Sequence, residues 1–161
     1  LENAEKLGIP VSIFESDIFD VTVQVEKNPC YLCARMRRGA LHAAAKEAGC
    51  SFVALGHHKN DAAETFLMNL LAGGTLACFS PKSYLDRREL TLIRPLIFAQ
   101  EADITRCAER AALPVVKSRC PVDGCTNRQR TKELLADLSA AYGPLNDKIL
   151  GAMQKAGLSG W

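Results

Sequence analysis

The chain has 161 residues, of which 48% are hydrophobic and 24% are charged, and its formal net charge is +2. This length and apolar content predict one globular unit with its own core, and the small net charge gives no global sign of a nucleic-acid-binding protein. No apolar run approaches the roughly 18 residues of a membrane span, and no signal-peptide pattern opens the sequence. We therefore expect a cytoplasmic protein with no membrane partner.

Strand-like and helix-like segments alternate along the chain. Short runs rich in β-branched and aromatic residues predict strands at 10–14, 51–56 and 113–118. Apolar residues spaced three and four apart predict helices at 30–48, 61–72, 101–112 and 127–141. Such alternation is typical of crossover connections, so the predicted fold class is α/β, a parallel sheet with helices on both faces.

Two further segments complete this outline. Residues 83–96 break the alternation, because polar residues, a short alternating run and Pro95 indicate a hairpin or an edge ribbon. Residues 143–161 have the pattern of a last amphipathic helix, whose apolar stripe predicts packing in the core or in a dimer. We therefore divide the chain into a main domain at 1–142 and a C-terminal helix and tail at 143–161.

The first cysteine pair lies at a predicted helix start. Asn28 is a good N-cap and Pro29 suits the first helical position, so Cys30 and Cys33 fall in the first turn. Their spacing of three puts both thiols on one face of the helix. The positive end of the helix dipole and the arginines at 35–38 favour the thiolate form of both side chains. Two such thiolates make half of a metal site.

A second cysteine pair could supply the other half. Cys120 and Cys125 follow the strand-like run at 113–118, and the carboxyl ends of parallel strands meet at one edge of a sheet. The spacing is compatible with four alternatives: a structural zinc site, a thioredoxin-like redox pair, an iron–sulfur cluster and unliganded thiols. Spacing alone does not decide between them. Of the seven cysteines, Cys50 and Cys107 are predicted core residues, and Cys78 has no predicted role.

Polar residues follow the strand-like run at 51–56. Gly56 permits a tight exit from the strand, and His57 and His58 come next. Asp61 falls at or near the start of the following helix, where the dipole favours a carboxylate that can hold hydrated Mg²⁺. Asp61 could equally be a helix cap with Glu64 as its capping-box partner.

Four motifs now resemble one family. "NPCYLCARMRRGAL", "VALGHHKNDAAETFLMNLL", "LIRPLI" followed by "EADI", and "CPVDGCTNRQRTKELLADL" stand in the order and spacing of the tRNA 2-thiocytidine synthetase (TtcA-type) family. This family belongs to the PP-loop ATP pyrophosphatase superfamily. The resemblance covers about residues 10 to 140.

The resemblance implies a fold, a reaction and a set of site residues. The fold would be of the adenine nucleotide α-hydrolase type. ATP would adenylate C2 of an anticodon-loop cytidine, and sulfur would then arrive through a [4Fe–4S] cluster held by three cysteines. The implied cluster ligands are Cys30, Cys33 and Cys120, with Cys125 as the alternative third ligand. The implied nucleotide residues are Asp61 on the Mg²⁺ side of ATP, Gly56, His57 and His58 in the loop, and Arg37, Arg38 and Arg94 facing phosphates.

The same resemblance implies partners and one departure from the pattern. The partners would be tRNA, ATP and a sulfur donor, either a cysteine desulfurase or sulfide, and the family commonly forms homodimers. The Ser-Gly-Gly-x-Asp-Ser loop that cradles pyrophosphate has no counterpart in the sequence, so we expect the chain to begin after it and to be inactive alone. The alternatives are a non-catalytic remnant that binds zinc or RNA and a relative that thiolates uridine.

Overall fold

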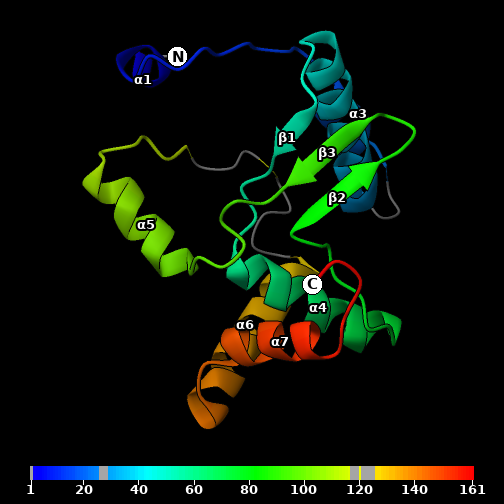
Figure 1. The fold of residues 1–161 in the computed structure, drawn as a ribbon, viewed down its shortest axis with the longest axis vertical. Helices are drawn as coiled ribbons and strands as arrows, with labels where there is room; N and C mark the ends of the chain where they lie inside the picture. Colours follow the sequence, from blue (N-terminus) through cyan, green and yellow to red (C-terminus); the bar gives the residue numbers. More distant parts are fainter. Residues whose placement is uncertain (1, 26–28, 117–119, 121–125) are drawn as a thin grey trace. The chain divides into compact units, whose positions relative to one another are not determined.

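A computed structural model describes residues 2–25, 29–116, 120 and 126–161 (Figure 1). The elements in chain order are α1 (Glu2–Lys6), α2 (Ile18–Val23), α3 (Pro29–Glu47), β1 (Phe52–Ala54), α4 (Lys59–Gly73), β2 (Lys82–Leu85), β3 (Leu90–Ile93), α5 (Glu101–Arg110), α6 (Asn127–Tyr142) and α7 (Leu145–Lys155). The chain divides into two compact units, Leu1–Val53 with Tyr84–Leu92 and Ala54–Ser83 with Ile93–Trp161. The α/β class and the four predicted helices are confirmed, with ends that differ by no more than two residues.

The sheet has three strands in the order β1-β3-β2. The β2–β3 hairpin confirms the ribbon predicted at 83–96, and its four-residue turn permits only an antiparallel pair. β1 and β3 run in parallel, as shown by the bonds from Thr91 N to Ser51 O at 2.9 Å and from Leu55 N to Ile93 O at 2.9 Å. The predicted parallel pairing is therefore present between β1 and β3, while the hairpin strand β2 makes the sheet mixed.

Two of the predicted strands do not form. Residues 10–14 and 113–116 have no strand conformation, and residues 117–118 lie outside the part that the structure describes. Val115 and Val116 are 82% and 84% exposed, and Ile13 and Phe14 are exposed as well. A strand needs a neighbour for its backbone hydrogen bonds, and neither segment has one among the described residues.

The first unit is built around α3. This helix begins at Pro29, as the sequence predicts, and α2 packs against it. Lys46 near its C-terminus pairs with Glu89 of the β2–β3 turn at 3.0 Å. α3 buries none of its residues within the described chain. The prediction that Cys50 is a core residue is wrong, since its side chain is exposed just after this helix.

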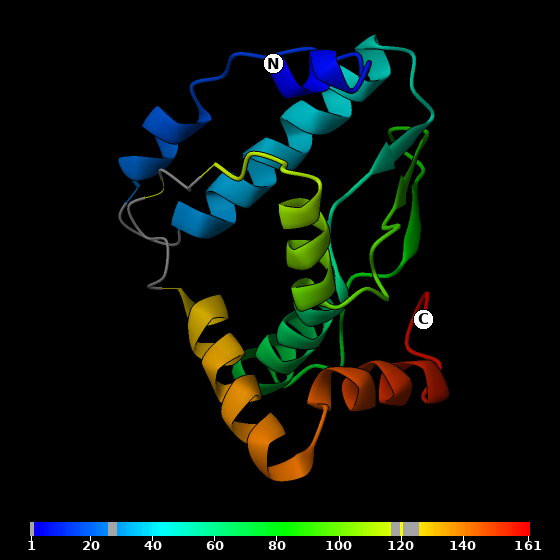
Figure 2. The same cartoon turned by 90° about the vertical axis from the view of Figure 1, so that its left-hand side faces the viewer.

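The core of the second unit lies between α4, α6 and α7, which pack against one another (Figure 2). Its buried members are Ala62, Ala63, Ile97, Leu135, Leu150 and Met153. Trp161 packs against this cluster, and its Nε1 donates to Phe79 O at 3.0 Å. The predicted apolar stripe of the last helix is confirmed as core packing by Leu150 and Met153. This core fixes the start of α4, where the candidate site lies.

α5 packs less closely. None of its residues is buried, although its pattern is strongly amphipathic. Cys107 on this helix is exposed, so the prediction that it belongs to the core is wrong. Among the described helices, none combines the length and apolar character needed to cross a membrane.

Candidate functional site

The loop from β1 to α4 is held by a reciprocal pair of hydrogen bonds. His58 is the N-cap of α4 in extended conformation, and its Nδ1 accepts from Asp61 N at 3.4 Å. Asp61 Oδ2 in turn accepts from His58 N at 2.9 Å. Asp61 therefore does stand in the first turn, as predicted. The predicted capping box is wrong in its partners, because His58 is the cap and Asp61, rather than Glu64, is the return residue.

The guanidinium of Arg128 contacts the other oxygen of the Asp61 carboxylate, Oδ1. Arg128, in the first turn of α6, donates from Nη1 to Asp61 Oδ1 at 2.7 Å and from Nη2 to Thr65 Oγ1 at 3.1 Å. Charge-assisted hydrogen bonds of this kind fix geometry as well as charge. Both oxygens of Asp61 thus have partners, and the starts of α4 and α6 are tied together. The only sequence signal for Arg128 was its place in the "NRQR" motif.

Glu64 lies one turn further along α4 and is buried. The residue is only 4% exposed, and its Oε2 lies 3.7 Å from Arg128 Nη1. Burial raises the pKa of the Glu64 carboxyl, while the Arg128 guanidinium opposes that shift. On α6, Lys132 donates to Glu101 Oε1 at 2.7 Å. The carboxylates of Asp61 and Glu64 lie one turn apart on α4, and Arg128 contacts both. These three side chains form a polar cluster in the second unit.

His57 and Arg94 both pack against the ring of Phe79. The ring centroids of His57 and Phe79 are 4.8 Å apart, and the Arg94 guanidinium lies over the Phe79 ring at 4.7 Å. Arg94 is 9% exposed and donates from Nη1 to Ser80 O at 2.5 Å. In the described part of the chain, His57 Nδ1 and Arg94 Nε are buried without a hydrogen-bond partner. The predicted contact of Arg94 with phosphate stays a prediction.

The setting of His57 makes stability depend on pH. Burial lowers the pKa of His57, and the Arg94 guanidinium lowers it further. The unfolded chain therefore binds a proton more readily than the folded chain, so the free energy of unfolding should fall as pH drops below about 6.5. Urea unfolding at a series of pH values, for the natural chain and for His57→Phe, measures this contribution. Equal acid-side slopes in the two proteins would contradict it.

The cysteines predicted as cluster ligands lie on separate parts of the chain. Cys30 is exposed and Cys33 is half-buried in the first turn of α3, with Arg37 and Arg38 exposed one turn later. Cys120 is exposed and belongs to the second unit. Cys125 lies outside the described residues. Within either unit, the described residues hold no group of three or more His, Cys, Asp or Glu side chains placed to bind a metal ion. The three-cysteine ligand set stays a prediction.

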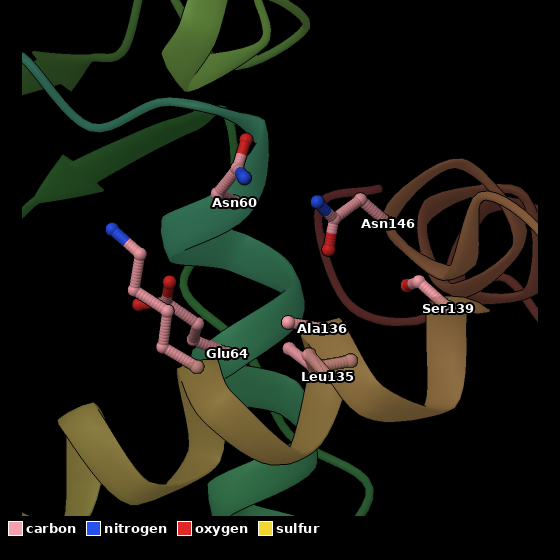
Figure 3. Close-up of a pocket in the computed structure, with 7 residues that line it drawn as sticks. Asn60, Glu64, Leu135, Ala136, Ser139 and Asn146 are labelled. Atoms are coloured by element: carbon pink, nitrogen blue, oxygen red, sulfur yellow. The ribbon is translucent and has the colours of Figure 1, made fainter.

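A cavity of about 260 Å³ opens beside the two carboxylates, between α4, α6 and α7 (Figure 3). Its lining combines two amides, a hydroxyl, the Glu64 carboxylate and the Lys132 side chain with an apolar patch. The lining residues are Asn60, Glu64, Lys132, Leu135, Ala136, Ser139 and Asn146. All of them belong to the second unit.

The α/β fold places a polar helix start, that of α4, directly after β1. Residues 2–132 match the PP-loop domain family, and the chain belongs to that family. The match includes the α3 thiols and Asp61.

Two of the most similar proteins share one name. The tRNA-cytidine(32) 2-sulfurtransferase of Syntrophotalea carbinolica is 41% identical over 126 residues, covering 77% of this chain and 49% of the relative. The protein of the same name from Alkalilimnicola ehrlichii is 40% identical over 140 residues, covering 84% and 45%. The chain thus spans about half the length of these relatives.

A solved structure has the same fold. It is the U34-tRNA thiolase NcsA from Methanococcus maripaludis with its [4Fe-4S] cluster, which superposes with a TM-score of 0.75 at 23% identity. The similarity covers 96% of this chain and 53% of that protein.

Proposed function

We propose that this chain is part of an ATP-dependent tRNA sulfurtransferase that replaces the C2 oxygen of an anticodon-loop cytidine with sulfur. The observation that carries the proposal is the carboxylate of Asp61, fixed at the start of α4 directly after β1. It stands in a PP-loop domain whose relatives are named tRNA-cytidine(32) 2-sulfurtransferase. The complete domain would be a parallel-sheet core of the adenine nucleotide α-hydrolase type, covered by helices on both faces.

The nucleotide side of the proposed site is the start of α4. Mg²⁺ prefers hard oxygen ligands and is held in nucleotide sites by one or two carboxylates together with phosphates and water. Asp61 supplies such a carboxylate in the first turn of α4, and Mg²⁺ bound there would take the place of Arg128 at Oδ1. Gly56, His57 and His58 would line the nucleotide loop. Arg37, Arg38 and Arg94 would meet phosphates of ATP or tRNA.

The sulfur side would be formed by cysteine thiolates. Cys30 and Cys33 lie three residues apart in the first turn of α3, so both thiols share one face of the helix. With Cys120 as third ligand, they would hold a [4Fe–4S] cluster, for which thiolates are the usual ligands. Such a cluster, held by three ligands, supplies an iron that can carry the sulfur to be transferred. The NcsA structure carries a [4Fe-4S] cluster on the same fold.

The proposed partners follow from this chemistry. The RNA substrate is a tRNA whose target base leaves its loop, since single-stranded loops are where proteins gain access to RNA bases. ATP is consumed in activating the base, and a cysteine desulfurase or sulfide supplies the sulfur. The protein would act as a homodimer.

Nucleoside analysis tests the proposed function. A bacterium deleted for its own tRNA-cytidine 2-sulfurtransferase lacks 2-thiocytidine, and we expect the natural gene product that carries this chain to restore it. Digested tRNA is examined by liquid chromatography and mass spectrometry. Restoration of 2-thiocytidine with unchanged 2-thiouridine supports the proposal. A protein that changes only 2-thiouridine, or neither nucleoside, overturns it.

A further inference from the structure

The cavity between α4, α6 and α7 carries hydrogen-bonding groups that the protein itself leaves unused. Among the described residues, the side chains of Asn146 and Ser139 make no hydrogen bond. Asn60 Oδ1 accepts from Glu101 N at 3.1 Å, and the amide nitrogen of Asn60 has no acceptor within the described ranges. Figure 3 shows Asn60 and Asn146 on opposite sides of the cavity, with Ser139 beside Asn146. The walls therefore offer both donors and acceptors to a ligand.

Glu64 adds a buried acceptor to these walls. The residue is 4% exposed, and among the described residues the one cationic side chain within 4 Å is Arg128, at 3.7 Å. That distance exceeds a normal hydrogen bond. The Glu64 oxygens are not among the buried, unpartnered atoms of the described chain, so they stay open to the cavity and can accept N–H groups from a ligand.

The size and floor of the cavity limit the ligand further. Its volume of about 260 Å³ falls just below the range of roughly 300–1,000 Å³ found for drug-sized ligands. Leu135, which is buried, and Ala136, which is exposed, give its lining an apolar part (Figure 3). A flat ligand with an apolar face and a polar edge, of about the size of one nucleobase, matches these limits.

We propose that this cavity binds the base of cytidine and that Glu64 recognises its exocyclic 4-amino group. The inference rests on the proposed function and specifies how the substrate base is chosen. Carboxylates accept hydrogen bonds from the cytosine N4 amine, whereas uracil presents an acceptor at the same position. The amide donors of Asn60 and Asn146 complement the N3 and O2 acceptors of cytosine. Glu64 would therefore distinguish cytosine, which has an amine at position 4, from uracil, which has a carbonyl there.

The location of Glu64 suits this role. Glu64 and Asp61 are three residues apart on α4 and therefore share one face of the helix, and Arg128 contacts both. A base bound at Glu64 would lie about one helical turn, or roughly 5 Å, from the carboxylate proposed for the Mg²⁺ side of ATP. Activation of the base by ATP requires such proximity.

A nucleoside titration of the 161-residue chain tests the inference. Cytidine and uridine are added separately, and the side-chain amide signals of Asn60 and Asn146 are followed by NMR spectroscopy. We expect cytidine to shift both signals and to bind at least about tenfold more tightly than uridine, the usual range for one charged hydrogen bond. Equal binding of the two nucleosides, or no shift with either, would overturn the inference.

Glu64→Gln sharpens the test, because it keeps the side-chain volume and replaces one acceptor by a donor. We expect cytidine affinity to fall roughly tenfold and the preference over uridine to disappear. Glu109→Gln is the matched control, since Glu109 is exposed on α5 outside the cavity, and it should bind as the natural chain does. Amide spectra of both variants check that they fold. An unchanged preference in Glu64→Gln would refute the role of Glu64.

These results are separable from the test of the proposed function. Restored 2-thiocytidine in cells without any nucleoside preference in vitro would remove the base pocket and leave the enzyme activity in place. A cytidine preference that depends on Glu64, without 2-thiocytidine in cells, would support the pocket and overturn the activity.

Discussion

Cys33→Ser is expected to remove iron from the protein and to abolish 2-thiocytidine formation. A serine hydroxyl is a poor ligand for iron–sulfur clusters, which are held by thiolates, so losing one of three ligands should leave the cluster unbound. The measurement is iron content per chain after anaerobic purification and reconstitution, together with the broad visible absorbance of the cluster. Nucleoside analysis of tRNA from cells that depend on the variant gives the functional readout.

Three further cysteine variants make this result specific. Cys120→Ser should lose iron in the same way, whereas Cys125→Ser should keep it, which decides between the two candidates for the third ligand. Cys50→Ser is the matched control, because Cys50 is exposed in the same unit as Cys33 and has no predicted ligand role. Stoichiometric zinc without iron in the reconstituted natural protein would contradict the cluster and favour the non-catalytic alternative.

The sequence predicts the local features of this fold well. α3, α4, α5 and α6 follow from apolar periodicity and cap residues, which act within a few neighbours along the chain. The hairpin of β2 and β3 follows from the same kind of signal. The runs at 10–14 and 113–116 do not form strands, because strand formation depends on more than local sequence. A strand is a property of two segments, and a short β-branched run does not reveal whether a partner is available.

In the candidate site, too, local features were predictable from the sequence, and contacts between distant segments were not. Asp61 near a helix start is a local feature, and its prediction is confirmed. Its cap partner was misassigned because histidine is an uncommon N-cap, and only the structure shows Nδ1 of His58 accepting from Asp61 N. Arg128 meets Asp61 across 67 residues of sequence, a contact that a single sequence does not display. The cavity beside Glu64 likewise depends on helix packing.

Arg94 illustrates how burial escapes sequence reasoning. The family resemblance implies that Arg94 faces phosphate, and that role stays a prediction. The sequence does not reveal that the guanidinium lies over Phe79 and donates to the Ser80 carbonyl, so the interior satisfies part of its hydrogen-bonding capacity. Its buried Nε lacks a partner in the described chain, which leaves one donor for a water molecule or a ligand.

Asp61→Asn is expected to lower the rate of ATP-dependent thiolation by on the order of a hundredfold or more, because a neutral amide is a much weaker ligand for Mg²⁺. The fold should survive this change. The asparagine oxygen can still accept from His58 N, and the lost pair with the partly exposed Arg128 side chain is worth less than about 1 kcal/mol. A large loss of rate with a nearly unchanged unfolding midpoint would therefore separate a role in the reaction from a role in stability.

The measurement is single-turnover thiolation of tRNA by the natural gene product over a range of Mg²⁺ concentrations, since a weakened cation site should raise the concentration needed for half-maximal rate. Asp103→Asn is the matched control, because Asp103 is an exposed carboxylate on α5 that pairs with Arg106. The control should keep both the rate and the Mg²⁺ dependence. If Asp61→Asn retains more than half of the natural rate, or if Asp103→Asn loses as much, the carboxylate at the start of α4 does not serve the nucleotide.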